Sequence, residues 1–171
     1  MMRPFVFFAE FEPGDKRGIV ASFPDVPEAI TQGDDMADAF GQATEALGLA
    51  LLTYPERGLP LPRAKARAHR LTPVAVAPDV AAKLAVLEPF RDAGITKAEL
   101  ARRIGKNEKE VRRILDPRHA TKLPALTEAL RVLGRRLVVG VQAAHAAATL
   151  CAGLIPRMLQ TATVSSAWFS V

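Results

Sequence analysis

Cysteine and long apolar segments are both scarce in this sequence. Among 171 residues there is a single cysteine, Cys151, which excludes an internal disulfide and a multi-cysteine zinc site and is typical of a reducing compartment. The N-terminal residues lead into a short aromatic run and not into the long apolar segment of a signal peptide. No apolar stretch reaches the length of a transmembrane helix. We therefore expect a cytoplasmic protein that does not associate with a membrane.

Signatures of common enzymes are missing as well. The sequence has no glycine-rich phosphate-binding loop and no nucleophile elbow centred on serine. His69, His119 and His145 do not have the spacing of metal ligands. We therefore expect a protein that is not an enzyme, binds no metal and carries no cofactor.

The net charge of +5 conceals two halves of opposite sign. Residues 1–58 contain 4 basic and 10 acidic side chains, a balance of −6, whereas residues 59–137 contain 18 basic and 8 acidic side chains, a balance of +10. An acidic surface suits a basic protein partner, and a basic surface suits a nucleic acid. Two solvated surfaces without partners would show the same asymmetry, so the charges alone leave both interpretations open.

The N-terminal residues predict a small sheet. Aromatic and β-branched residues dominate two runs, and a turn with proline, glycine and charged residues separates them, which is typical of a hairpin. A stiff turn with Pro24 and Pro27 on either side of Asp25 precedes a shorter third run. The expected strands cover residues 5–11, 19–23 and 29–32.

A helix is predicted directly after this sheet. Gly33 permits a sharp turn, and Asp34 or Asp35 can cap the helix because a carboxylate accepts hydrogen bonds from the free N–H groups of the first turn. Apolar residues then recur at steps of three and four positions. Because Pro55 should break the helix, we expect it to span residues 35–53.

This N-terminal pattern resembles a known family. The turn Phe-Pro-Asp-Val-Pro at 23–27, the segment Thr-Gln-Gly-Asp at 31–34 and the helical run Ala-Thr-Glu-Ala-Leu at 43–47 are similar, in this order, to the N-terminal domain of HicB-type antitoxins. The resemblance implies a reduced version of the RNase H-like fold. It also implies a partner of the HicA type, which is a small RNA-cleaving toxin.

A connector and a second helical region follow. The connector, about residues 55–72, contains a basic run that is either a solvated linker or a set of phosphate contacts. Residues 72–77 are expected to return to the sheet as a fourth strand. A helix over 78–93 should come next, with a kink or break at Pro89 and a stop at Gly94.

Two short helices with their own start signals come next. Thr96 with Glu99, and Asn107 with Glu110, each have the spacing of a capping box, in which each side chain bonds the other residue's backbone N–H. Gly105 lies at the turn between the two helices. The apolar spacing around this turn resembles the helix-turn-helix of repressor-type DNA-binding proteins. A helical hairpin without a nucleic-acid partner is the alternative.

The remaining residues predict one more helix and a strand. Pro124 lies in the first turn of a helix that ends at Gly134. Residues 135–141 favour a strand, and its segment Leu137–Val141 is a candidate for joining two copies. From the paired helices onward the pattern resembles the helix-turn-helix version of the HicB family, so the two resemblances together cover residues 3–142. Residues 143–171 fit no pattern.

Together these patterns predict an α+β protein with three parts. A β-β-β-α(-β) domain of reduced RNase H-like type, expected to bind the toxin, spans residues 1–77. An all-α helix-turn-helix domain with a C-terminal strand, expected to bind DNA, spans residues 78–142. A tail of unknown structure spans residues 143–171.

The second helix of the pair has one apolar side, so its polar side chains must face outward. In a helix-turn-helix this helix enters the major groove, where Arg112 can bond guanine through two N–H groups. Lys97, Lys106 and Arg118 suit phosphates, although the repressor family usually has an apolar residue in place of Lys106. The predicted DNA-binding residues are Lys97, Lys106, Asn107, Glu108, Lys109, Arg112, Arg113, Arg118 and His119.

The resemblance implies an antitoxin that neutralises a HicA-type toxin and represses its own operon by binding operator DNA as a homodimer or higher homo-oligomer. Glu10, Asp25 and Glu28 are the candidate toxin contacts, because they are acidic and belong to the acidic half.

Two other functions stay open. A stand-alone repressor with a sensing N-terminal domain would have the same C-terminal part, and a neighbouring gene for a short basic protein would favour the antitoxin instead. A metal-dependent RNase H-like nuclease, the remoter alternative, would bind Mg²⁺ through N-terminal carboxylates. The carboxylates in question are Glu10, Asp25, Asp34, Asp35 and Asp38.

Overall fold

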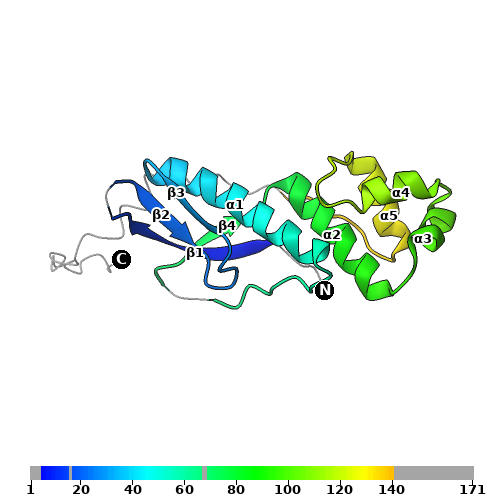
Figure 1. Ribbon diagram of the computed structural model, residues 1–171, viewed down its shortest axis with the longest axis horizontal. Coiled ribbons are helices and arrows are strands. Elements are labelled where there is room, and N and C mark those ends of the chain that lie inside the picture. The colour runs from blue at the N-terminus through cyan, green and yellow to red at the C-terminus, as the bar shows by residue number, and fades with distance from the viewer. Residues whose placement is uncertain (1–4, 16, 67–68, 141–171) are drawn as a thin grey trace, which may run out of the picture. The chain divides into compact units, whose positions relative to one another are not determined.

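The computed structural model describes residues 5–15, 17–66 and 69–140, and these form a mixed α+β structure in which an antiparallel sheet precedes a group of helices (Figure 1). The predicted tail over 143–171 lies outside the described residues. The elements in chain order are β1 (Val6–Pro13), β2 (Ile19–Ser22), β3 (Ile30–Gly33), α1 (Met36–Glu56), β4 (Thr72–Ala75), α2 (Pro78–Ala93), α3 (Lys97–Ile104), α4 (Glu108–Ile114) and α5 (Leu123–Val132).

The sheet has the strand order β3-β2-β1-β4, with every neighbouring pair antiparallel. The four predicted strands are therefore confirmed. Phe11 pairs with Ala21 and Phe7 pairs with Val74, so alternate side chains of β1 share one face with the inner residues of both neighbours. Helix α1 covers this face and closes the first hydrophobic core.

Helix α1 begins as predicted but ends later. Asp35 is its N-cap, and its carboxylate accepts hydrogen bonds from the backbone N–H groups of Ala37 and Asp38 at 2.8 and 2.9 Å. The predicted break at Pro55 is wrong, because the helix continues through Pro55 to Glu56. A proline in the last turn removes one hydrogen bond and does not interrupt a longer ladder.

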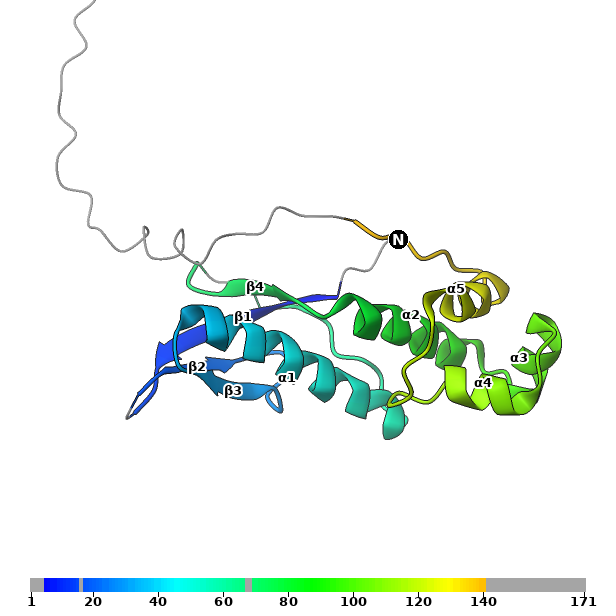
Figure 2. The ribbon, with the colours of Figure 1, turned by 90° about the horizontal axis from the view of Figure 1, so that it is seen from above.

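The helices after the sheet form a second core, separate from the first. Pro89 does not break α2, which runs as one helix until Gly94 ends it in the left-handed conformation. Helices α3 and α4 are joined by a short turn in which Gly105 has a φ of 74°, and α5 packs against α2 and α3 (Figure 2). No helix of the described residues is long and apolar enough to cross a membrane.

The predicted strand over 135–141 is wrong as far as the described residues reach. Residues 135–140 have no regular secondary structure, and Val141 lies outside the described part. Val138 and Val139 are 64% and 71% exposed. A strand needs a pairing partner for its backbone groups, and β-propensity alone does not supply one.

Candidate nucleic-acid interface

Helix α4 is held at its start by a complete capping box. The Asn107 side-chain oxygen accepts from the Glu110 backbone N–H at 2.8 Å, and the Glu110 carboxylate accepts from the Asn107 backbone N–H at 3.3 Å. Val111 and Ile114 are buried in the second core. The predicted outward face of α4 is therefore confirmed, because Glu108, Lys109, Arg112 and Arg113 are exposed, as is Glu110.

Arg112, the predicted guanine contact, is paired along the helix. Its Nη2 lies 2.6 Å from Oε1 of Glu108, and the two side chains are 66% and 46% exposed. An exposed pair of this kind contributes little stability because water screens both charges. The pair with Glu108 therefore holds Arg112 only weakly.

Helix α3 has only one half of its predicted capping box. Thr96 accepts from the Glu99 backbone N–H at 3.1 Å, but the Glu99 carboxylate accepts instead from Arg102 and Arg103 at 2.7–2.9 Å. Hydrogen bonds from these two arginines lower the pKa of Glu99 to about 2. The sequence spacing could not show that arginines one turn ahead compete for the same carboxylate.

The two lysines predicted to bind phosphate lie in different settings. Lys106, in the turn, points its Nζ to within 3.7 Å of the Glu128 carboxylate on α5 and is only 30% exposed. This contact explains how a charged residue is accommodated where an apolar one was expected. Lys97 is exposed in the first turn of α3.

The loop between α4 and α5 holds the other two predicted contacts. Arg118 donates through Nε and Nη2 to the Glu56 carboxylate at 2.7 and 3.2 Å, and these bonds raise the pKa of Arg118 and lower that of Glu56. His119 is exposed, and its Nδ1 lies 3.4 Å from Oγ1 of Thr121. Arg118 is therefore paired with a carboxylate, although its side chain is 81% exposed.

Sequence reasoning missed Lys83, which belongs to the predicted apolar helix over 78–93. Lys83 is 5% exposed, and its ammonium donates to the Ile114 carbonyl at 3.0 Å and to Oγ1 of Thr121 at 2.6 Å. Burial lowers the pKa of Lys83. The available signal was that Lys83 lies three positions after Val80 and four before Leu87, on the apolar side of that helix.

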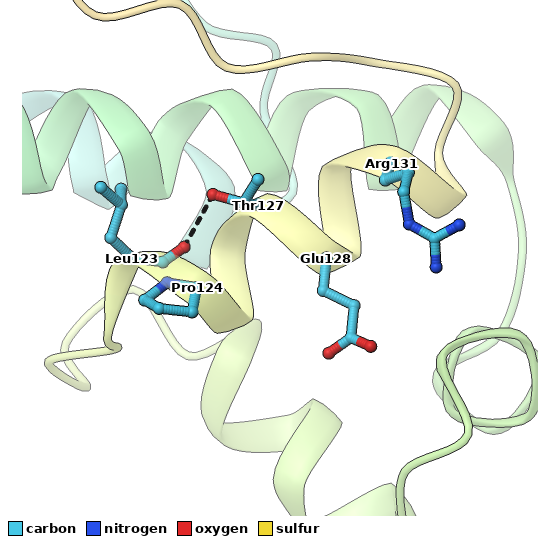
Figure 3. Close-up of a pocket in the computed structure, with 5 residues that line it drawn as sticks. All are labelled: Leu123, Pro124, Thr127, Glu128 and Arg131. Carbon is cyan, nitrogen blue, oxygen red and sulfur yellow. Dashed lines mark hydrogen bonds between the residues drawn. The ribbon is translucent and has the colours of Figure 1, made fainter.

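A shallow hollow of about 500 Å³ lies on α5 (Figure 3). One helix supplies all of its lining, and Thr127 Oγ1 bonds back to the Leu123 carbonyl at 2.9 Å. The hollow is therefore a feature of the α5 surface and has no converging polar groups from other elements. Its lining residues are Leu123, Pro124, Thr127, Glu128 and Arg131.

The three acidic residues predicted to contact a toxin all bond within the chain. Glu10 pairs with Arg70 at 2.9 Å, and Asp25 accepts from the backbone N–H groups of Lys65 and Ala66 at 2.8 and 2.7 Å. Glu28 accepts from the hydroxyl of Tyr54 at 2.9 Å. Burial and this bond raise the pKa of that hydroxyl.

Four of the five carboxylates considered for a nuclease site, those of Glu10, Asp25, Asp35 and Asp38, have contacts within the chain that explain them. Asp35 caps α1, and Asp38 accepts from the Asp34 backbone N–H at 2.9 Å. Within the described residues, no three or more histidine, cysteine or acidic side chains are grouped so as to hold a metal ion.

Comparison with known proteins gives several similar sequences. No protein-family profile matches the chain. It is 36% identical over 133 residues to antitoxin HicB 1 of Photorhabdus laumondii, covering 77% of this chain and 83% of that protein. It is 39% identical over 127 residues to antitoxin HicB of Escherichia coli K12, covering 73% and 91%. A HicB antitoxin of Pseudomonas fluorescens is 33% identical over 134 residues, covering 78% and 90%.

Proposed function

Because the chain belongs to the HicB antitoxin family, we propose that it neutralises a HicA-type RNA-cleaving toxin and represses its own operon by binding operator DNA. An antitoxin has a toxin as its partner, and the acidic balance of residues 1–58 suits a basic one. We assign toxin binding to residues 1–77 and DNA binding to residues 78–142, with no enzymatic activity in either. The protein then acts in the cytoplasm, where its toxin cuts RNA.

One observation supports the DNA-binding part most strongly. Helices α3 and α4 bury their apolar sides in a common core and meet at a tight glycine turn, while α4 keeps two arginines and a lysine on its outer face. This is the arrangement in which a helix-turn-helix inserts its second helix into the major groove. We propose that Arg112 reads a base, with Asn107, Glu108, Lys109 and Arg113 beside it on the groove side.

Phosphate contacts would orient this helix on the duplex. We propose Lys97, Lys106, Arg118 and His119 for that role, since they lie in the first turn of α3, in the turn before α4 and in the loop after it. Arg118 must then exchange Glu56 for a phosphate, which costs little because its side chain is 81% exposed.

A single α4 reads only half of a two-fold symmetric site, so we propose a homodimer or higher homo-oligomer on an inverted repeat. Val138 and Val139, which are exposed after the last helix, offer apolar surface for a contact between copies.

The first experiment mixes the purified full chain with DNA from upstream of its own coding sequence. We expect a complex with nanomolar-range affinity that weakens steeply as salt rises, because phosphate contacts release counterions. The same affinity for a scrambled duplex would contradict operator recognition.

A second assay incubates the purified chain with RNA or DNA in the presence of Mg²⁺ or Mn²⁺. We expect no cleavage, and cleavage that Asp25→Ala removes would favour the nuclease function instead.

A further inference from the structure

Lys83 is the sole buried polar or charged side chain among the described residues. It comes from α2, and its ammonium ends between the last residue of α4 and the loop that follows it. Burying an ammonium costs free energy that an apolar residue at the same position would not. The two hydrogen bonds of the ammonium therefore point to a role for Lys83 in holding α4 in place.

The first of these bonds fixes the end of α4. Ile114 is the last residue of α4, and the carbonyls of a final helical turn have no partner within the helix. They also form the negative end of the helix dipole, which favours a cation. The 3.0 Å bond from Lys83 therefore ties the C-terminal end of α4 directly to α2.

The second bond extends the connection into the loop. Oγ1 of Thr121 accepts from Lys83 at 2.6 Å and lies 3.3 Å from the Arg113 carbonyl and 3.2 Å from the His119 carbonyl. Its single hydrogen can be donated to either carbonyl. Lys83 and Thr121 thus join α2, the end of α4 and the loop that carries the proposed phosphate contacts.

We propose that Lys83 and Thr121 are positioning residues that set the orientation of α4 in the major groove, and so set the preference of the protein for its operator over other DNA. This inference rests on the proposed operator binding. Contacts to base edges require placement of the reading helix to within about 0.5 Å. Contacts to phosphates are electrostatic and tolerate larger shifts, so a loosened α4 loses sequence preference before it loses DNA affinity.

The test measures two affinities for each full-length variant by fluorescence anisotropy. One duplex is the DNA upstream of the chain's own coding sequence, and the other is a scrambled duplex of the same length and composition. For Lys83→Met we expect the ratio of the two affinities to fall roughly tenfold or more. Affinity for the scrambled duplex and its salt dependence should not change, since a buried ammonium neutralises no phosphate.

Substitutions at Thr121 provide a matched pair. Thr121→Val keeps the shape and removes the hydroxyl, so it should lower the ratio as Lys83→Met does. Thr121→Ser keeps the hydroxyl and should retain the wild-type ratio. A thermal melt of each variant shows whether it folds. If Lys83→Met does not fold, the two Thr121 variants still test the proposal.

Lys97→Met makes the same chemical change at an exposed, proposed phosphate contact. It should weaken binding to both duplexes alike and leave their ratio unchanged. If the wild-type protein prefers its upstream duplex and Thr121→Val keeps that preference, the inference is wrong while operator binding stands. If the wild-type protein shows no preference, both the operator binding and the inference are overturned.

Discussion

The acidic sheet region and the basic helical region use their charged side chains in different ways. In the sheet region the carboxylates of Glu10, Asp25 and Glu28 bond to residues far along the chain, between 26 and 60 positions away. In the helical region Arg102, Arg103 and Arg112 pair with carboxylates three or four residues away on their own helices. The first kind of pair connects segments that are far apart in the chain, whereas the second leaves each arginine on an exposed helix face.

This difference shows that the charge balance of a region does not reveal which charges are available to a partner. Asp25 contributes to the −6 of residues 1–58, yet its carboxylate holds the connector in place. Arg112 is exposed, and its ion pair with Glu108 is weak because water screens both charges. Arg112 is therefore more available to a partner than Asp25 is.

Among substitutions that should affect one region more than the other, we expect the largest effect from Gly33→Ala. A Cβ at Gly33 would lie 2.2 Å from the Ala39 backbone nitrogen, so Gly33→Ala must push α1 away from β3. We expect a loss of about 1–3 kcal/mol of stability from such overpacking and weaker toxin neutralisation, measured by thermal unfolding and an RNA-cleavage assay. DNA binding by α4 should change less.

Gly41 is the matched control, because a Cβ there meets nothing within 4 Å. Gly41→Ala lies inside α1 on an exposed position and should stabilise the protein by about 0.5–1 kcal/mol. Equal melting temperatures for the two variants would show that α1 does not pack on β3 as described.

In the helical region, Arg112→Ala should cost about 1–3 kcal/mol of discrimination at one base pair of the operator. Lys106→Ala should weaken binding to all DNA sequences alike. It should also make the fall of affinity with rising salt less steep, by the amount expected for the loss of about one phosphate contact. Binding titrations at several salt concentrations on operator and point-mutated duplexes distinguish these results. If Arg112→Ala lowers the affinity for all duplexes equally, Arg112 contacts phosphates and not a base.

A smaller effect is expected from the two N-caps. Asn107→Ala removes a side chain that takes part in a reciprocal capping box and should cost about 1 kcal/mol. Thr96→Ala removes a single cap bond and should cost less. Urea titrations of both variants test this order, and a larger loss at Thr96 would contradict it.

The smallest effect concerns pH. The pKa of Glu99 is about 2 in the folded chain, below its ordinary value of 4.5, because Arg102 and Arg103 bond its charged form. Its contribution to stability is therefore present above pH 4.5 and is lost as the pH falls from there toward 2. Melts over this range should show a steeper decline for the wild type than for Glu99→Gln. Parallel declines would mean that these bonds do not persist in solution.

Much of the fold could be predicted from local sequence signals. The strands, the Asp35 cap and the pair of short helices follow from alternation, capping spacing and glycine turns, which depend on neighbouring residues. The predictions that failed depend on distant or competing partners. Glu99 had two arginines available to it, residues 135–140 had no strand to pair with, and Pro55 came too late in α1 to end it.

The site was harder to predict for the same reason. The outward face of α4 follows from helical geometry and is confirmed. The burial of Lys83 depends on a carbonyl 31 positions away and on Thr121, 38 positions away. The bond between Arg118 and Glu56 spans 62 positions. Periodicity within one element carries no information about such contacts.

The division of labour between the two regions is tested most directly by one RNA-cleavage assay. A HicA-type toxin is incubated with RNA and increasing amounts of the wild-type protein or its Arg112→Ala variant. We expect both proteins to abolish cleavage at the same molar ratio, because Arg112 belongs to the region proposed to bind DNA. Undiminished cleavage at excess wild-type protein would contradict the antitoxin function, and weaker neutralisation by Arg112→Ala alone would contradict the separation of the two regions.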